Sequence, residues 1–326
     1  MVKTINIPKI NPLKDSDNRP FWSVMITTYN RTDYLEKCIK SVISQNFSPE
    51  EMQIEVVDDH SQKDIKEIVD IIGNNRVSFY RQPQNVGIYA NWNTCIERAK
   101  GRWIHILSDD DLVAPEFYQA YGRMIEKYHP SVVIGQSKFI DENDKETGIS
   151  PALQESEGIL NNALQVLAVR NLIRTPGIVI SREAYEKVGG FTSDLLFTPD
   201  WEMWTRLAES VKIAYINLPY SFFRLHSASE TSRLVLTGEY VTDNLDAAKI
   251  IHARINNLKE RKKTKLEFNQ WLSSTTYYYA QKILSKNLYL PGLKMAFISL
   301  KLSPSIAHFK KITKLLLRST LNLIHP

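Results

Sequence analysis

Three consecutive aspartates, Asp109 to Asp111, follow directly after an apolar run at residues 103–108. Carboxylates this close repel one another, and the repulsion raises their pKa unless a cation neutralises them. Hard divalent cations such as Mg²⁺ and Mn²⁺ prefer oxygen ligands of this kind. Open α/β sheets also bind ligands at the carboxyl ends of their strands. The triplet therefore predicts a Mg²⁺ or Mn²⁺ site and, through the cation, a phosphorylated substrate.

Three further polar motifs occur where strands are expected to end. They are TTYNR at 27–31, DDHS at 58–61, and the group Asn85, Gly87, Asn91 and Asn93. Asn, Asp and Ser are common turn residues, so each motif alone is compatible with a simple turn. All four motifs in this order, on alternating strands and helices, favour one shared binding site.

The elements that would position these motifs alternate from Phe21 onward. Asp33 is a plausible N-cap of the first helix and Pro115 a plausible first-turn residue of a later one. This βαβα order predicts a mostly parallel sheet with helices on both faces. The expected strands are 22–29, 54–57, 77–81, 103–108 and 132–134, and the expected helices include 35–43, 65–72 and 90–99.

The second half of the chain changes character. Residues 141–157 are polar and are expected to form a loop, whereas 177–181, 211–216 and 220–225 are expected strands and 199–209 a helix. After about Glu239 the pattern is helical to the end. We therefore expect three parts: an N-terminal arm at 1–20, a catalytic domain at 21–238, and a basic helical region at 239–326 that could associate with a membrane.

Composition is that of an ordinary globular protein, with 43% hydrophobic and 24% charged residues among 326. Cys38 and Cys95 lie in predicted helices, so buried free thiols in a reducing compartment are expected. Residues 1–20 are polar and interrupted by prolines, unlike a signal peptide. No uncharged apolar run reaches the roughly 18–20 residues that cross a bilayer. These features together predict a cytoplasmic protein.

At this point the chain resembles the family 2 glycosyltransferases, which have the GT-A fold. The matching stretches, over residues 21–226, are SVMITTYNRTDYLEKCIKSVISQ, IEVVDDHS, NVGIYANWN, GRWIHILSDDDLVAPEFY and TPDWEMWTRLAE. The resemblance implies an inverting enzyme of bacterial surface-polysaccharide synthesis, such as that of O-antigen or capsule. It would transfer a sugar from a nucleotide-sugar donor to a hydroxyl of a lipid-linked oligosaccharide or surface polysaccharide.

The resemblance also implies roles for individual residues. Tyr29 and Asp59 would contact the nucleobase and Asp109 the ribose, while Asp110, with Asp111, would hold the metal that bridges the diphosphate. The nucleotide site would further include Thr28, Asn30, Arg31, Asn85, Gly87 and Asn93. Two positions depart from the family pattern. Ser108 replaces the first aspartate of D-x-D-D, and Trp92 precedes Asn93 where an arginine is common; Trp92 is expected in the core.

Asp200 and Glu202 lie at the start of the helix expected at 199–209. Inverting transfer needs a base that deprotonates the acceptor hydroxyl. In the resembling family a glutamate-aspartate pair stands here and the aspartate is the base. Asp200 matches that aspartate and Pro199 replaces the glutamate, so Asp200 is the expected base and Glu202 the alternative. Asp200 could instead simply cap the helix.

Arg224 and His226 follow a late predicted strand. Their R-x-H spacing resembles the family segment that contacts pyrophosphate or metal, so Arg224 would pair with phosphate and His226 would ligate the metal. A lone histidine is more often structural, which is the expectation for His105. Residues 174–191 match the acceptor-side segment of the family, but no side chain there identifies the acceptor.

The C-terminal region is strongly basic. The whole chain carries +5, but from Phe268 to Pro326 eight basic residues face no Asp or Glu. Apolar residues alternate with lysines between Ile306 and Ile324, which is typical of a helix at an anionic membrane surface. A polyprenyl-diphosphate-linked acceptor would fit a location on the inner face of the cell membrane. The alternative is a helix packed on the domain, and no motif supports nucleic-acid binding.

Two other function classes remain open from the residues alone. A nucleotidyltransferase of sugar phosphates also uses paired aspartates and Mg²⁺, but TTYNR is not the Gly-rich phosphate loop expected there. A non-catalytic nucleotide-sugar-binding protein would not need carboxylates at both Asp110 and Asp200.

Overall fold

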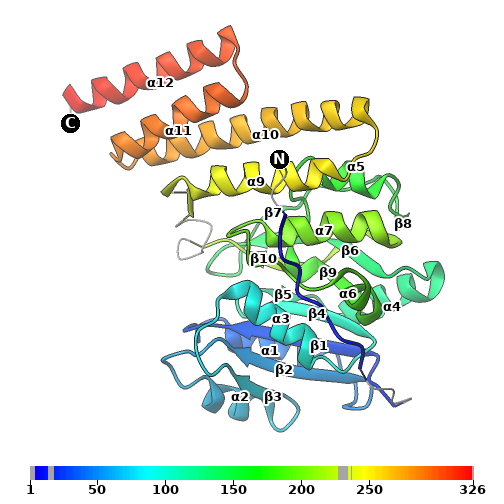
Figure 1. Cartoon of the computed structure of the whole chain (residues 1–326). Coiled ribbons are helices and arrows are strands. Elements are labelled where there is room, and N and C mark those ends of the chain that lie inside the picture. The colour runs from blue at the N-terminus through cyan, green and yellow to red at the C-terminus, as the bar shows by residue number, and fades with distance from the viewer. Residues whose placement is uncertain (1–3, 14–17, 227–233, 236, 325–326) are drawn as a thin grey trace.

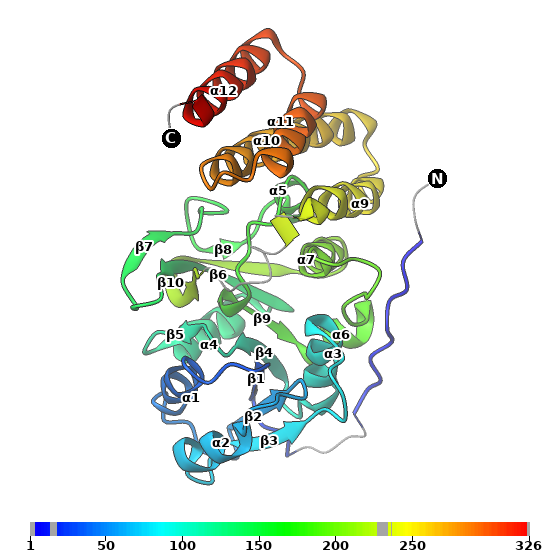
Figure 2. The ribbon, with the colours of Figure 1, turned by 90° about the vertical axis from the view of Figure 1, so that its left-hand side faces the viewer.

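A computed structural model describes residues 4–13, 18–226, 234–235 and 237–324. Its centre is a ten-stranded mixed sheet in the order β3-β2-β1-β4-β9-β6-β10-β5, with β7 paired to β6 and β8 to β10. Helices cover this sheet, and further helices are stacked above it (Figures 1 and 2). The mostly parallel α/β sheet expected from the sequence is confirmed.

The amino-terminal part of the sheet is parallel. Strand β1 pairs in parallel with both β2 and β4, and β2 pairs in parallel with β3. The carboxyl ends of these strands therefore meet at one edge, which brings their polar motifs together. The bounds are β1 Trp22–Thr28, β2 Met52–Asp58, β3 Ser78–Arg81 and β4 Trp103–Ser108.

The remaining strands include antiparallel pairs. Strand β6 (Val132–Ile140) is parallel to β10 (Ile213–Arg224), whereas β9 (Ile178–Ser181) is antiparallel to both β4 and β6. Short antiparallel strands complete the sheet: β5 Leu112–Val113, β7 Glu146–Ile149 and β8 Gly158–Ile159.

Helices pack on both faces through apolar stripes, and the two faces hold separate core clusters. Leu35, Cys38 and Val42 of α1 are buried, and Cys38 and Cys95 are both buried free thiols, as expected. Trp92 and His105 are also buried, which confirms their expected core positions. The helices are α1 Leu35–Ile43, α2 Ile65–Gly73, α3 Ile88–Arg98, α4 Phe117–Tyr128, α5 Ala163–Leu167, α6 Arg182–Val188 and α7 Pro199–Ser210.

Several local expectations were wrong. Helix α1 has Tyr34 at its N-cap without a side-chain cap, so Asp33 does not cap it. Helix α4 starts at Phe117 after Glu116 in the left-handed region, so Pro115 lies outside its first turn.

Two strand predictions also needed correction. The expected loop at 141–157 contains β7, which extends the sheet through a pairing with β6. The two strands expected at 211–216 and 220–225 form the single strand β10. This strand passes Pro219 through register shifts at Ile216/Pro219 and Pro219/Ser221. Bulges of this kind let a strand continue past a proline.

The expected helical region follows in four helices: α9 Glu239–Ala253, α10 Leu258–Leu284, α11 Tyr289–Leu302 and α12 Ile306–Ile324. Helix α9 lies over α7, and α10 to α12 are stacked progressively farther from the sheet (Figures 1 and 2). A third apolar cluster joins them to α7, with Trp201 stacked on Phe268. None of the described helices is long and apolar enough to cross a membrane.

The N-terminal arm lies along the outside of the catalytic part, beside α3 and α6 (Figure 2). Ile10 is buried in the core, and the Gly190 N–H donates to the Pro8 carbonyl at 2.7 Å. Gly189 has φ +86°, and a Cβ there would lie 2.7 Å from the Pro8 oxygen. Glycine therefore allows the arm to approach this closely.

Candidate active site

The aspartate triplet forms a tight turn at the end of β4. The Asp109 N–H donates to the Thr27 carbonyl at 3.0 Å, and the Thr28 hydroxyl donates to Asp109 Oδ2 at 2.6 Å. The parallel pairing of β1 and β4 thus joins the first and fourth motifs directly. Asp109 is buried and faces the end of β1.

Arg31 bridges the first two aspartates of the triplet. Its NH1 group lies 3.1 Å from Asp109 Oδ1 and also contacts Asp110 Oδ2. Although burial opposes the charge of Arg31, the carboxylates of Asp109 and Asp110 raise its pKa. The guanidinium therefore supplies the positive charge that three adjacent carboxylates require.

Asp110 and His226 form the pair best suited to a metal ion. The Asp110 side chain is 16% exposed and that of His226 only 7%, and His226 Nε2 lies 2.9 Å from Asp110 Oδ2. A carboxylate oxygen and an imidazole nitrogen are suitable ligands for Mn²⁺ and acceptable for Mg²⁺. Across the described ranges, no three His, Cys, Asp or Glu side chains are arranged as a metal cluster. Asp110 and His226 are therefore the two side chains that could hold a divalent cation here.

Asp111 and Arg224 lie behind this pair and face the interior. The Arg224 N–H donates to Asp111 Oδ1 at 2.9 Å, and Arg224 Nε donates to the Asp110 carbonyl at 2.8 Å. The Arg224 guanidinium also binds the Asp141 carbonyl and Asp144, and lies 4.2 Å from the Tyr34 ring centroid. Both residues therefore hold the triplet turn in place, and the Nε and NH1 groups of Arg224 are bound to main-chain carbonyls.

The three carboxyl groups differ in acidity. Burial, reinforced by the neighbouring Asp110 charge, raises the pKa of Asp109 to about 7 and also raises that of Asp111. Burial opposes the charge of Asp110 too, but the His226 hydrogen bond and the Arg31 charge lower its pKa. Asp110 is thus the carboxylate of the triplet that remains ionised and accessible.

Asp59 organises the loop that carries the third motif. Its carboxylate accepts from the Val86 N–H at 2.7 Å, the Gly87 N–H at 2.9 Å and the Asn85 amide at 3.1 Å. Gly87 has φ +85°, which glycine adopts readily. Burial raises the pKa of Asp59, and these N–H groups offset part of that increase.

Tyr29 and Asn30 lie beside this loop at the end of β1. Tyr29 is 49% exposed, so its ring is available to a ligand. Asn30 has φ +54°, its N–H donates to Ser61 Oγ at 2.7 Å, and its side chain accepts from the Gln62 N–H at 2.6 Å. Asn30 therefore ties the first motif to the second.

The nitrogen and the oxygen of the Asn93 side-chain amide both bind the main chain of Phe191. Its Nδ2 donates to the Phe191 carbonyl at 2.8 Å, and its Oδ1 accepts from the Phe191 N–H at 2.7 Å. This reciprocal pair fixes the segment after Gly190 on α3. It leaves little capacity for the nucleotide contact expected from the sequence.

Asp200 lies in the first turn of α7. Its Oδ2 accepts from Asn171 Nδ2 at 2.7 Å and its Oδ1 from the Trp201 N–H at 2.7 Å. Burial raises the pKa of Asp200 to about 6, although both donors and the nearby Arg174 charge act in the opposite direction. A carboxylate with this pKa is a stronger base than an ordinary aspartate and is still mainly ionised at neutral pH.

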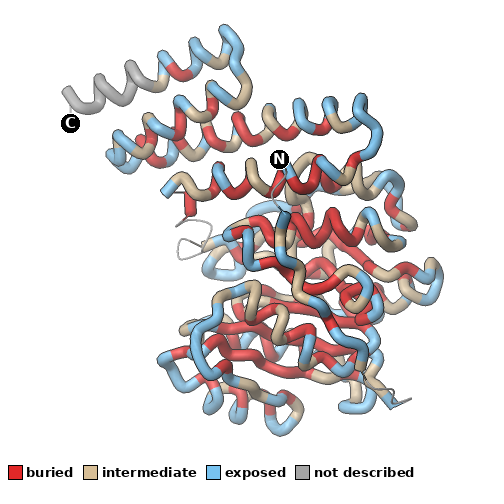
Figure 3. Tube along the Cα trace, in the orientation of Figure 1, coloured by how far each residue is buried: buried red, intermediate tan, exposed pale blue. Residues whose placement is uncertain are grey.

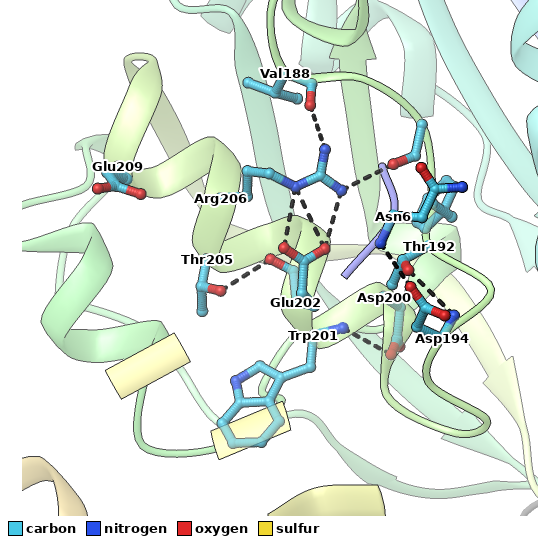
Figure 4. Close-up of polar contacts among 12 residues, drawn as sticks. Asn6, Val188, Thr192, Asp194, Asp200, Trp201, Glu202, Thr205, Arg206 and Glu209 are labelled. Atoms are coloured by element: carbon cyan, nitrogen blue, oxygen red, sulfur yellow. Dashed lines mark hydrogen bonds and ion pairs between the residues drawn. The ribbon is translucent and has the colours of Figure 1, made fainter. Parts of the chain in front are cut away.

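Glu202, two residues away, has a different environment (Figure 4). It is fully buried, its Oε2 lies 2.9 Å from Arg206 NH2, and its Oε1 contacts Arg254, the C-cap residue of α9. Arg206 in turn donates to the Val188 and Gly190 carbonyls. Glu202 is thus the centre of an ion-pair network between α7, α9 and the Gly190 segment, and is not free to act as a base.

Comparison of the sequence with known protein families identifies the family of this chain. Residues 23–189, half of the chain, match the profile of glycosyl transferase family 2. The chain belongs to this family. It is also similar to glycosyltransferase AglE of Haloferax volcanii, with 26% identity over 192 residues, covering 58% of this chain and 61% of AglE.

Solved structures show the same fold. The S. aureus TarS 1–349 complex with UDP-GlcNAc has a TM-score of 0.64 at 16% identity, covering 90% of this chain and 83% of that one. The mannosyltransferase PcManGT from Pyrobaculum calidifontis, in complex with GDP-Man and Mn²⁺, has a TM-score of 0.56 at 16% identity, covering 99% and 91%. The chain therefore has the GT-A fold expected from its motifs.

Asn171 was missed by the sequence analysis, although it holds the carboxylate of Asp200. It lies 29 residues before Asp200, in a segment between α5 and η1 (Thr175–Gly177) without a recognisable motif. A single asparagine in such a segment carries no sequence signal for this contact.

Proposed function

We propose that this glycosyltransferase is a metal-dependent inverting enzyme. It transfers a sugar from a nucleotide-sugar donor to a hydroxyl of a lipid-linked oligosaccharide or surface polysaccharide. The observation that carries the proposal is the ionised, accessible Asp110 beside His226 at the strand edge that also holds Asp59. PcManGT, which shares the fold, binds GDP-Man and Mn²⁺.

The donor would lie across the ends of β1, β2 and β4. Tyr29 and the Asp59 loop would hold the nucleobase, and Asp109 the ribose. Asp110 and His226 would hold Mg²⁺ or Mn²⁺, which would stabilise negative charge on the departing diphosphate. Arg31 already contacts Asp109 and Asp110, so its guanidinium lies where it would bind phosphate oxygens once the donor is present.

Asp200 would act as the base. It takes the proton of the acceptor hydroxyl as that oxygen forms a bond to the anomeric carbon of the donor sugar. The bond from the anomeric carbon to the diphosphate oxygen breaks on the opposite face, so the configuration inverts and a nucleoside diphosphate leaves. Asn171 and the Trp201 N–H orient the Asp200 carboxylate for this step.

The test compares hydrolysis of a panel of nucleotide sugars by the wild type and Asp110→Asn, with Mn²⁺ and with EDTA. The wild type is expected to hydrolyse at least one donor only with the metal. Asp110→Asn is expected to lose about 100-fold or more of this rate, because it removes a charged ligand from the ion. Metal-independent hydrolysis that is equal in both proteins would contradict the mechanism.

A peripheral position on the inner face of the cell membrane would suit a polyprenyl-diphosphate-linked acceptor. The outer helices α11 and α12 support this part of the proposal. Leu290 and Phe297 of α11 and Ile306 and Phe309 of α12 are exposed between 54% and 82%. Lysines 294, 301, 310 and 314 lie among them and are also exposed. Apolar side chains with interspersed lysines are suited to an anionic membrane surface.

A further inference from the structure

Arg174 lies next to Asp200 without a partner for its charge. It stands at the start of η1, and its Cζ is 5.8 Å from the Phe139 ring centroid and 5.6 Å from that of Phe223. Phe139 and Phe223 are register partners on β6 and β10, so their rings share one face of the sheet. These rings form a platform that holds the guanidinium by cation–π contact.

The N–H donors of Arg174 remain available. Within the ranges that the structure describes, its guanidinium makes no hydrogen bond and no ion pair, and its Nε is buried. Aromatic faces stabilise a cation without using its N–H groups. A partly buried guanidinium without a carboxylate partner is costly, so this arrangement indicates an anion that the described residues do not provide.

Neighbouring groups reinforce this conclusion. Among the neighbouring charges, the Asp200 carboxylate has the largest effect on the pKa of Arg174. The oxygens of Asp200, however, accept hydrogen bonds from the Asn171 amide and the Trp201 N–H. Asn171 Oδ1 is buried and has no hydrogen-bond partner among the described residues. Burial lowers the pKa of Arg174, and the charge of Arg170, a second half-buried arginine, lowers it further. Arg174 and the unbonded amide oxygen of Asn171 therefore lie near the base, and Arg170 adds positive charge close to Arg174.

The position of Arg174 distinguishes it from the metal side of the site. Adjacent side chains on a strand point to opposite faces, so Phe223 and Arg224 of β10 face in opposite directions. Arg224 faces the aspartate triplet, through Asp110 and Asp111. Phe223 faces Arg174. Arg174 thus lies on the Asp200 side of β10, where the acceptor would enter.

We propose that Arg174 binds an anionic group of the acceptor, a phosphate or a carboxylate, next to the hydroxyl that Asp200 deprotonates. This inference rests on the proposed function, since it assigns a substrate class to the same site. A planar guanidinium can bind either anion through two parallel hydrogen bonds. Asn171 Oδ1 can accept a hydrogen bond from a neighbouring sugar hydroxyl.

The test measures binding of three probes to the full chain without donor: glucose 6-phosphate, glucuronate and neutral glucose. We expect one or both anionic sugars to bind about tenfold or more tightly than glucose, as for hydrogen bonds to a charged group. The two anionic probes separate phosphate from carboxylate as the natural group. Equal binding of all three probes by the wild type would overturn the proposal.

Variants test whether Arg174 causes the preference for anionic sugars. Arg174→Gln is expected to reduce binding of the preferred anionic sugar to the level of glucose, and Arg174→Lys to keep part of it. Arg123→Gln, an exposed arginine on α4, is the matched control and should change nothing. If Arg174→Gln does not fold, Arg170→Gln and Arg174→Lys remain as tests, with an expected loss of about two- to fivefold each.

A second readout separates the acceptor from the donor. Affinity for UDP and GDP with Mn²⁺ should change less than about twofold in Arg174→Gln. A variant that loses nucleotide affinity but keeps the anionic sugar would place Arg174 in the donor site and contradict the proposal. Donor hydrolysis by the wild type is measured separately, so its absence would count against the proposed function and not against the anion site.

Discussion

At the scale of residues, two carboxylates on the first turn of α7 have opposite environments. Asp200 accepts only neutral donors and has a raised pKa, whereas Glu202 is enclosed by Arg206 and Arg254. The family pattern favoured Asp200 as the base, but the sequence could not exclude Glu202. The reason is that Arg254, one of the two arginines that neutralise Glu202, lies 52 residues away.

The pKa of Asp200 leads to a prediction about pH. A base must be deprotonated to act, so kcat/KM should fall about tenfold per pH unit below the Asp200 pKa of about 6. A pH profile of transfer, with donor saturation checked at each point, measures this. A profile that stays flat down to about pH 4.5 would show that the raised pKa does not govern the reaction.

The same shift predicts an effect on stability. Because its pKa is higher in the folded state than the ordinary value of 3.8, Asp200 stabilises the fold only when protonated, and this contribution is lost as pH rises to about 6. Asp200→Asn should therefore abolish transfer and increase the free energy of unfolding at pH 7.5 by about 1–3 kcal/mol. Urea unfolding at pH 7.5 and pH 4 measures this, and the gain should shrink at the lower pH.

Other residue roles were only partly accessible from sequence. The expected grouping of Thr28, Asp59 and Asp109 at one edge follows from parallel strands, whose carboxyl ends coincide. Arg224 and Asn93 fit the family pattern, but the Nε and NH1 groups of Arg224 and the Asn93 amide are bound to main-chain groups. Whether a donor group is already hydrogen-bonded within the protein depends on contacts between distant segments. The spacing of residues along the chain does not reveal those contacts.

At the scale of elements, α7 connects the catalytic sheet to the C-terminal helices. Its amino-terminal turn carries Asp200, its interior carries Glu202, and its apolar face packs through Trp201 onto Phe268 of α10. The periodicity of residues 199–209 predicted the helix itself. Its burial against α9 and α10 was not predictable, because those helices share no motif with it.

Glu202→Gln should strongly destabilise the protein, because Arg206 and Arg254 would both lose a buried countercharge. We expect a loss of about 3–5 kcal/mol in the free energy of unfolding, measured by urea denaturation. Glu209→Gln is a control on the same helix. Glu209 is exposed and lies 3.4 Å from Arg254, so its loss should cost less than about 1 kcal/mol. Similar losses for both variants would contradict a special role of the buried network.

Strand β10 shows why element boundaries were hard to predict. The sequence predicted two separate strands, at 211–216 and 220–225. The structure instead absorbs Pro219 in bulges and keeps β10 paired with β6 on both sides. Whether such a segment forms one strand or two depends on the strand that it pairs with. The sequence of the segment alone does not reveal that neighbouring strand.

At the scale of the whole molecule, most of the basic residues between 268 and 324 belong to helices α10 to α12, at the end opposite to β3 (Figure 1), and these helices have exposed stretches (Figure 3). Ile306, Lys310 and Lys314 are four residues apart on α12, so they share one side of the helix. The sequence predicted this basic amphipathic helix, and the structure places it outermost.

Lys310→Gln combined with Lys314→Gln should weaken binding to vesicles rich in phosphatidylglycerol. Each lysine near an anionic surface contributes about 1 kcal/mol, so we expect a decrease of about 30-fold in the partition coefficient. Vesicle cosedimentation measures it, with Lys66→Gln combined with Lys100→Gln as the control at the other end of the molecule. An equal decrease in the control would show that net charge alone matters.

The position of the N-terminal arm has a consequence for synthesis of the protein. Ile10 belongs to the core, and the arm is held by groups far along the chain, such as Asp194, which accepts from the Asn6 N–H. These residues of the arm thus cannot reach their final place until much of the catalytic part has been translated. Domains generally fold as units during translation, so docking of this arm would be a late event.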